Sequence, residues 1–166
     1  EIYIKETLDY KNGNLVGFAE NDILSQAKTV QAFLISSVFG SMKEVVSLQP
    51  VRNISGDQLH EMVLSILKVL LGYGFIVVAV VTDNVRVNQN MLMKLTEGSA
   101  DKHYFHLSPD YPTFVMFDTV HLLKNIRNNW LNLKNITKTF IFPDFDNNKL
   151  VRKANFVDIR NFYKLE

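Results

Sequence analysis

The chain contains 166 residues, of which 47% are hydrophobic, so it can bury one substantial core but not two independent ones. It has no cysteine, which excludes a disulfide framework and a cysteine-ligated zinc site and fits a reducing compartment such as the cytosol or nucleus. No apolar run approaches the roughly 20 residues that cross a bilayer, and no basic-then-apolar leader opens the sequence, so we expect neither a membrane protein nor a precursor with a signal.

The net charge of +1 is unevenly distributed along the chain. Residues 1–118 hold 9 Lys and Arg against 13 Asp and Glu, whereas residues 119–166 hold 9 against 4. The second portion is therefore the better candidate for contact with an anionic partner such as nucleic acid. An asymmetry of this size also arises without any function, and composition alone favours neither interpretation.

The first 51 residues predict an antiparallel meander. Asn12-Gly13 lies between two extended segments and favours a tight hairpin, because both residue types tolerate the positive φ that such a turn demands. A second extended pair covers residues 30–39 and 45–51, with Gly40-Ser41 at the turn.

After residue 51 the apolar residues change from alternation to helical spacing. Ser55 and Gln58 have the Ser-x-x-Gln spacing of a capping box, and apolar residues follow at intervals of three and four until Gly72 or Gly74. The next segment, residues 75–81, is continuously apolar and rich in β-branched residues. This composition is typical of a central strand that is covered on both faces.

The rest of the chain alternates helix with strand. Four segments are expected in order: a helix at 88–95, a polar connection, a strand at 113–117 and a helix at about 119–133. Beyond Asn135 the period is less clear, since residues 140–145 fit a short strand or loop and residues 155–165 fit a helix.

This order of elements predicts an α/β fold with a mixed sheet. Strand–helix–strand crossovers within one sheet are almost always right-handed and make the two strands parallel. We therefore expect residues 75–81 to run parallel to the first strand of the meander, with residues 113–117 beside them. The carboxyl ends of these two strands then lie at one edge of the sheet, where open α/β sheets bind their ligands.

One acid follows each of these strand ends, Asp83 after the first and Asp118 after the second. Carboxylate oxygens are the ligands that Mg²⁺ prefers, and water and substrate phosphates complete its coordination shell. A pair of such ions stabilises the attacking and leaving oxygens of a phosphodiester displacement. The alternative is structural, because an Asp between a strand and a helix is often only an N-cap. Both interpretations stay open for each acid.

The helix after Asp118 has one strongly polar face. Its polar residues recur at i, i+3, i+4 and i+7: His121, Lys124, Asn125 and Asn128. With Arg127 beside it, this face has the donors that bind phosphates, although an ordinary solvated face has the same composition and is the commoner case. His121, like His103 and His106 in the polar connection, has the chemistry of a metal ligand, but a single His without partner spacing is weak evidence.

Three stretches of the chain resemble the motifs of a known protein family, in the same order. They are residues 1–5, the Val-Val-Thr-Asp-Asn stretch at 80–84 with Asn88 after it, and the Phe-Asp-x-x-His-Leu-Leu-Lys-Asn-x-Arg-Asn-Asn string at 117–129. In this order they resemble the P element family of DNA transposases, including its domesticated THAP-domain relatives. The resemblance covers nearly the whole chain, and the last string is its most specific part.

The resemblance implies an RNase H-like catalytic domain, with residues 1–135 as its N-terminal part. Three acids of such a domain bind Mg²⁺ or Mn²⁺ and catalyse hydrolysis and strand transfer of DNA phosphodiesters. Asp83 matches the second acid and is the expected catalytic residue, while the first and third acids are expected to lie outside this chain. Residues 136–166 are expected to lead toward a GTP-binding insertion domain of the parent protein.

Further roles are expected from the polar residues near the two strand ends, taken together with this resemblance. Asp118 is expected to share the metal with Asp83, and His121 and Asn84 are expected to support the site. The candidates for DNA contact are Lys124, Arg127 and Asn128. The parent protein is expected to be a nuclear homo-oligomer that acts on DNA without a membrane, whereas the 166-residue chain alone is expected to be inactive.

Two other functions are considered. The first is a domesticated descendant that binds DNA or protein without catalysis, which the presence or absence of all three acids in the parent would decide. The second is a flavodoxin-like domain that binds a small molecule. The antiparallel opening and the lack of a Gly-rich phosphate loop are poor matches to that second class.

Overall fold

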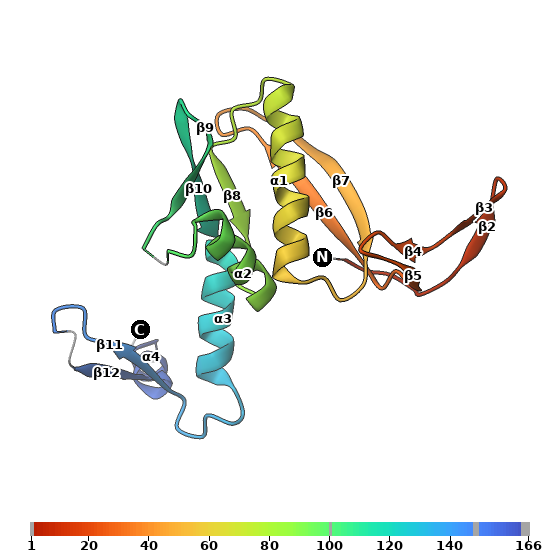
Figure 1. The fold of residues 1–166 in the computed structure, drawn as a ribbon. Coiled ribbons are helices and arrows are strands. Elements are labelled where there is room, and N and C mark those ends of the chain that lie inside the picture. Colours follow the sequence, from red (N-terminus) through yellow and green to blue (C-terminus); the bar gives the residue numbers. More distant parts are fainter. Residues whose placement is uncertain (1, 100, 148–149, 164–166) are drawn as a thin grey trace. The chain divides into compact units, whose positions relative to one another are not determined.

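The computed structural model describes residues 2–99, 101–147 and 150–163. These residues form a mixed α/β structure with four helices and several small sheets (Figure 1). The chain divides into two compact units. Unit 1 comprises Glu1–Val80 and Val85–Met116, and unit 2 comprises Val81–Asn84 and Phe117–Glu166.

Two short hairpins lie near the start of unit 1. β2 (Asp9–Lys11) pairs with β3 (Asn14–Val16), and the linking residues Asn12 and Gly13 have φ of 49° and 83°. The predicted Asn-Gly turn is thus confirmed, because both residues adopt the left-handed backbone that it requires. β4 (Phe18–Ala19) and β5 (Asp22–Gln26) form a second hairpin, whose strands are too short to show a clear period in the sequence.

The predicted meander is a three-stranded antiparallel sheet. Its strands lie in the order β1 (Ile2–Tyr3), β6 (Thr29–Ser36) and β7 (Lys43–Val51). The long hairpin expected from residues 30–51 is therefore confirmed. A bulge between Phe33 and Leu34 shifts its register.

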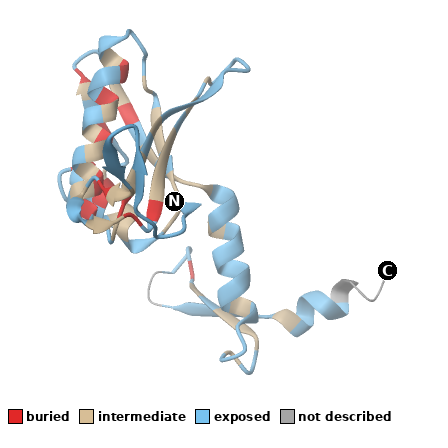
Figure 2. Ribbon diagram, turned by 90° about the vertical axis from the view of Figure 1, so that its right-hand side faces the viewer, coloured by how far each residue is buried: buried red, intermediate tan, exposed pale blue. Residues whose placement is uncertain are grey.

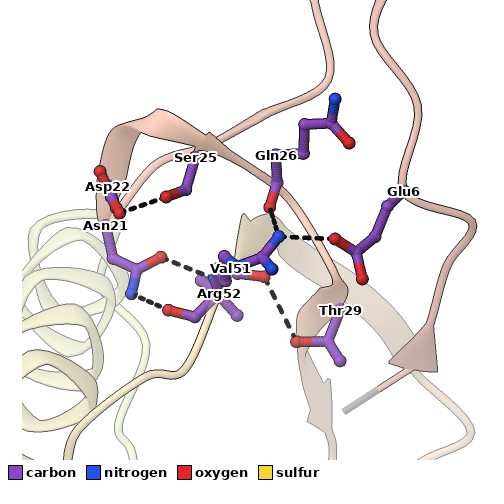
Figure 3. Close-up of polar contacts among 8 residues, drawn as sticks. All are labelled: Glu6, Asn21, Asp22, Ser25, Gln26, Thr29, Val51 and Arg52. Atoms are coloured by element: carbon purple, nitrogen blue, oxygen red, sulfur yellow. Dashed lines mark hydrogen bonds and ion pairs between the residues drawn. The ribbon is translucent and has the colours of Figure 1, made fainter.

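Side-chain contacts beyond the end of β7 hold the β4–β5 hairpin in place (Figure 3). Asn21 donates from its amide to the carbonyl oxygen of Arg52 at 2.7 Å and accepts from the backbone N–H of Arg52 at 2.8 Å. The guanidinium of Arg52 lies 2.6 Å from the Glu6 carboxylate and donates to the carbonyl oxygen of Gln26 at 3.1 Å. Paired polar groups therefore help to fix this corner of unit 1, together with the buried side chains of Ala19, Ala27 and Val51.

The core of unit 1 includes the packed faces of α1 (Gly56–Gly72) and α2 (Arg86–Leu95). The predicted capping box is confirmed, since Ser55 Oγ accepts from Gln58 N at 3.2 Å and Gln58 Oε1 accepts from Ser55 N at 3.0 Å. α2 begins two residues earlier than predicted. Figure 2 shows buried residues gathered on both helices. The buried apolar residues of the two helices are Leu59, Val63, Leu67, Leu70, Met91, Leu92 and Leu95.

The segment predicted as a central strand differs most from the structure. β8 covers only Ala79–Thr82, and it lies at the edge of a three-stranded sheet in the order β8-β10-β9. The described strands do not form one mixed sheet, so the prediction that residues 75–81 pair with the first strand of the meander is wrong. The prediction that β10 (Tyr111–Phe117) lies beside β8 is confirmed. The expected cover on both faces is also not found, since Ile76 is 66% exposed and Val81 is 58% exposed. An unbroken apolar run does not identify a strand's neighbours, because pairing is a long-range contact.

β9 (Tyr104–Ser108) falls within the segment predicted to be a polar connection. It pairs antiparallel with β10, with Phe105 opposite Thr113, so His106 lies in a strand and not in a loop. Phe105 and Thr113 are both buried. β9 is only five residues long, and polar residues flank it. Its alternation of exposed and buried side chains is therefore too short to be recognised in the sequence.

Unit 2 contains two helices and a hairpin. Its elements are α3 (Thr119–Leu131), β11 (Thr139–Pro143), β12 (Val151–Asn155) and α4 (Phe156–Tyr163). The predicted helix after Asp118 and the short strand near residue 140 are confirmed, whereas β12 was not predicted. The last helix begins one residue later than predicted, and its predicted end at Leu165 lies outside the described residues.

An aromatic cluster holds unit 2 together. The ring of Trp130 lies 5.5 Å from Phe140 and 6.0 Å from Phe156, measured between centroids. Among the described residues of this unit no apolar side chain is fully buried. Edge and face contacts between aromatic rings thus replace a closed core.

Candidate active site

The carboxyl ends of β8 and β10 are joined through the backbone. Asp118 donates from its N–H to the carbonyl oxygen of Thr82 at 2.7 Å. Four residues earlier in both segments, Phe114 of β10 donates to the carbonyl oxygen of Val78, directly before β8, at 2.9 Å. The constant offset shows that the two strands run parallel, as predicted. The residues directly after β8 therefore adjoin the residue that follows β10.

Asp118 is the N-cap of α3. Its Oδ1 accepts from the backbone N–H of Val120 at 2.8 Å and of His121 at 3.3 Å, and its Oδ2 lies 3.0 Å from Nδ1 of His121. The hydrogen bond with the His121 side chain, followed by those from the backbone N–H groups, lowers the pKa of Asp118 below its ordinary value of 3.8. Asp118 is therefore ionised at neutral pH.

The capping interpretation of Asp118 is confirmed, and its metal-binding role stays a prediction. Both carboxylate oxygens already have protein partners, so a metal ion would have to share them. His121 contacts Asp118 directly and is suited to orient that carboxylate.

Asp83 and Asn84 stand directly after β8, where the sequence placed them. The bond between Thr82 and Asp118 brings the backbone at Asp83 next to the start of α3. The structure thus brings together the two strand ends that the sequence predicted to meet. The roles of Asp83 as a metal ligand and of Asn84 as its support stay predictions.

The described residues do not complete a metal centre. In residues 2–99, 101–147 and 150–163, no three His, Asp or Glu side chains gather so that they could hold a metal ion. Two-metal catalysis of phosphodiester displacement needs ions clamped about 4 Å apart by several carboxylates. The donor set described here does not fit such a pair of ions.

The predicted DNA-contact residues lie exposed on α3: Lys124, Arg127 and Asn128. Arg127 donates from its guanidinium to the Asn128 side-chain oxygen, with Nη2 at 3.0 Å and Nε at 3.3 Å. This pairing leaves the Asn128 amide N–H groups to face an acceptor. The arrangement suits phosphate contacts, which position a protein on DNA without reading sequence.

Sequence reasoning missed the residues that fix the other end of α3. Lys138 donates from Nζ to the carbonyl oxygens of Leu131 at 3.1 Å and Asn132 at 2.6 Å, and its own carbonyl oxygen accepts from Trp130 Nε1 at 2.6 Å. Asn135 donates to the carbonyl oxygen of Trp130 at 3.1 Å. A Lys that follows a helix end is a signal for capping of its last carbonyls, and it was available in the sequence.

Carboxylates that follow adjoining parallel strands, in a mixed α/β structure, fit the class of RNase H-like proteins. Residues 1–96 match the family described as TNP-like, RNase H N-terminal domain. This match spans more than half of the chain, and the chain belongs to that family. The resemblance seen in the sequence is thereby confirmed.

A solved structure has a similar fold. The Drosophila P element transposase strand transfer complex matches with a TM-score of 0.69 and 22% sequence identity. The match covers 99% of this chain and 32% of that chain, so this chain spans about a third of the length of its structural relative. None of the curated proteins matches the sequence. No helix of the described residues is long and apolar enough to cross a membrane.

Proposed function

We propose that this chain is part of the catalytic domain of a DNA transposase, whose parent protein cleaves DNA phosphodiesters and joins strands. The observation that carries the proposal is the hydrogen bond from Asp118 N–H to the Thr82 carbonyl oxygen. It joins the backbone directly before Asp83 to Asp118 at the edge where parallel strands end, in a chain of the RNase H family, and so supports a shared site for the two acids.

In this proposal Asp83 binds the divalent metal ion, Mg²⁺ or Mn²⁺, that RNase H-like transposases generally use. The bound metal ion would supply stabilisation of the attacking and leaving oxygens. Asp118 contributes a second negative charge, and His121 and Asn84 hold the two strand ends in position. The remaining acids come from the parent protein, because the described residues hold no three-ligand group.

DNA is the proposed partner of the basic portion after Asp118. That portion carries 9 Lys and Arg against 4 Asp and Glu. Lys124 and Arg127 are exposed on one helix, and Arg127 orients Asn128 beside it. Such contacts would bring the phosphate backbone close to the N-terminus of α3, which favours negative charge.

The test is Asp83→Ala in the parent protein. We expect loss of strand cleavage and strand transfer on a labelled transposon end, with little change in the melting temperature. Glu61→Ala, on the exposed side of α1, is the matched control and should keep full activity. A variant at Asp83 that keeps activity but melts several degrees lower would mean that Asp83 has only a structural role.

A non-catalytic descendant that only binds DNA or protein is the second candidate. The described residues contain no three-ligand group. This fits a non-catalytic descendant as well as it fits one part of an active catalytic domain. The same cleavage assay on the unmodified parent separates the two candidates. The flavodoxin-like alternative is not favoured, because the chain belongs to an RNase H family.

Four further properties of the parent protein are part of the proposal. It acts in the nucleus, as access to chromosomal DNA requires, and it assembles as a homo-oligomer. Residues 136–166 connect the RNase H-like part, residues 1–135, to a domain that binds GTP. The sequence of the chain has no phosphate-cradling glycine loop of its own, so GTP would bind outside it.

A further inference from the structure

α3 depends strongly on its two ends. It has 13 residues, none of which is buried, and Figure 2 shows it exposed along most of its length. A helix of this length is marginal in water when it buries no apolar face. Its order therefore rests on partners for the backbone groups that the helix ends leave unsatisfied. Asp118 supplies such partners at the start of the helix.

Lys138 supplies the partners at the other end of α3. Its Nζ donates to the carbonyl oxygens of Leu131 at 3.1 Å and Asn132 at 2.6 Å. Its own carbonyl oxygen accepts from Trp130 Nε1 at 2.6 Å and from the backbone N–H of Phe156 at 3.1 Å. The carboxyl end of a helix favours a cation, so the ammonium group stabilises this end by charge as well as by hydrogen bonds. One residue thus ties the end of α3 to the start of α4.

Lys138 makes these contacts from an unfavourable backbone conformation. Its φ is 47°, in the left-handed region that residues with a side chain rarely adopt. Glycine adopts this conformation at no steric cost, so the turn by itself would favour Gly at this position. Strained residues persist where the surrounding contacts require them, and they cluster at functional sites. The contacts of the Lys138 side chain are therefore the feature that needs an explanation.

The helix end that Lys138 holds carries two of the candidate DNA contacts. Asn128 lies in the last turn of α3, and Arg127, directly before it, donates to the Asn128 side-chain oxygen at 3.0 Å. Fraying of this turn would separate the two side chains and release the guanidinium of Arg127. Helix ends open at a small cost in free energy, so the cap determines how much of the time these side chains stay aligned.

We propose that Lys138 is a positioning residue for DNA binding, which orders the last turn of α3 and so aligns Arg127 and Asn128 for contact with the phosphate backbone. This inference rests on the proposed function, in which α3 contacts DNA. Lys138 acts through its neighbours and not by its own contact with DNA, because two carbonyl oxygens already occupy two of the three N–H donors of its ammonium group.

Three substitutions of Lys138 and one control separate alignment of α3 from loss of charge. Lys138→Met removes the ammonium group and keeps a long side chain, Lys138→Gly also removes the backbone strain, and Lys138→Arg restores a cation with several donors. Lys134→Met is the matched control, because it removes the same charge from an exposed Lys of the same loop. Circular dichroism melts show that each variant is folded at the assay temperature.

Fluorescence anisotropy with a labelled duplex measures the dissociation constant of the 166-residue chain, with Arg127 present and in an Arg127→Ala background. We expect Lys138→Met and Lys138→Gly to weaken binding at least about five-fold more than Lys134→Met, and Lys138→Arg to recover most of the loss. In the Arg127→Ala background this excess should fall to about two-fold or less, because no aligned guanidinium is left to lose.

Hydrogen exchange of the backbone N–H groups of residues 128–131 measures the order of the last turn without DNA. Lys138→Met should raise these exchange rates about five-fold, since a frayed turn no longer protects its N–H groups, and Lys134→Met should leave them unchanged. Unchanged exchange in Lys138→Met would contradict the proposal, because the turn would then not depend on the Lys138 ammonium group.

Equal losses of binding in Lys138→Met and Lys134→Met would overturn the inference, since charge alone would then explain both. A loss of the same size with and without Arg127 would mean that Lys138 contacts DNA independently, and full binding by Lys138→Gly would mean that only the turn matters. A chain that binds no duplex at all leaves nothing to position and would also refute the inference. These measurements need no cleavage, so an inactive parent protein with the coupling intact would refute the catalytic function alone, whereas an active parent without the coupling would refute only the role of Lys138.

Discussion

Asp118 shows how one carboxylate can serve the backbone and a neighbouring side chain at once. Its folded pKa lies below the ordinary 3.8, so it stabilises the native state at any pH above 3.8, and that stability is lost as the pH falls through the lower folded value. We expect Asp118→Ala to lower the melting temperature at pH 7 and Asp118→Asn to lower it less, because Asn retains the cap. Circular dichroism melts at pH 7 and at pH 3 or below measure both effects. The melting temperatures of Asp118→Ala and the unmodified chain should differ less at the lowest pH. If the difference stays as large there as at pH 7, ionisation of Asp118 is not involved.

At the scale of elements, two glycines near the first hairpin are required for different physical reasons. Gly13 and Gly17 both have positive φ, 83° and 112°. A Cβ on Gly13 would meet open space, whereas a Cβ on Gly17 would overlap the carbonyl oxygen of Thr7. We expect Gly13→Ala to cost about 1 kcal/mol of unfolding free energy from the left-handed backbone alone, and Gly17→Ala to cost about 1–3 kcal/mol more from the overlap. Urea unfolding of both variants measures the difference, and equal costs would mean that the chain near Thr7 moves aside freely.

Local signals predicted the elements that depend on neighbouring residues. The Asn12-Gly13 turn needs only left-handed backbone at two positions, and the capping box of Ser55 and Gln58 closes within one helical turn. β8 depends instead on strands far away in sequence, so its composition suggested a central position that the structure does not show. The same contrast holds at the site. The meeting of the strand ends followed from the order of elements, but the hydrogen bonds that occupy both oxygens of Asp118 could be read only from the coordinates.

At the scale of the whole molecule, the two units differ in what stabilises them. All the fully buried apolar side chains of the described residues belong to unit 1, while unit 2 relies on aromatic contacts and on the polar contacts of Lys138 and Asn135. The proposed catalytic residues lie in unit 2. A site in such a unit gains rigidity from partners that supply further burial, which agrees with the proposal that the parent protein completes the site.

The 166-residue chain should therefore bind divalent metal weakly and fail to cleave DNA. A hard cation held by Asp83, or by Asp83 and Asp118 together, lacks the ligands that fix two-metal geometry, and the described residues offer no third. The chain should still bind duplex DNA through its basic portion, with little sequence preference and an affinity that falls steeply with salt. Calorimetric titration with Mg²⁺ and Mn²⁺, and binding and cleavage assays on labelled duplex, measure these properties. The logarithm of the DNA-binding constant falls linearly with the logarithm of the salt concentration. Replacing Lys124 and Arg127 by Ala should make this slope less steep by about 1 for each phosphate that the variant no longer binds. Robust cleavage by the unmodified chain that disappears in Asp83→Ala would show instead that a complete site lies within these residues.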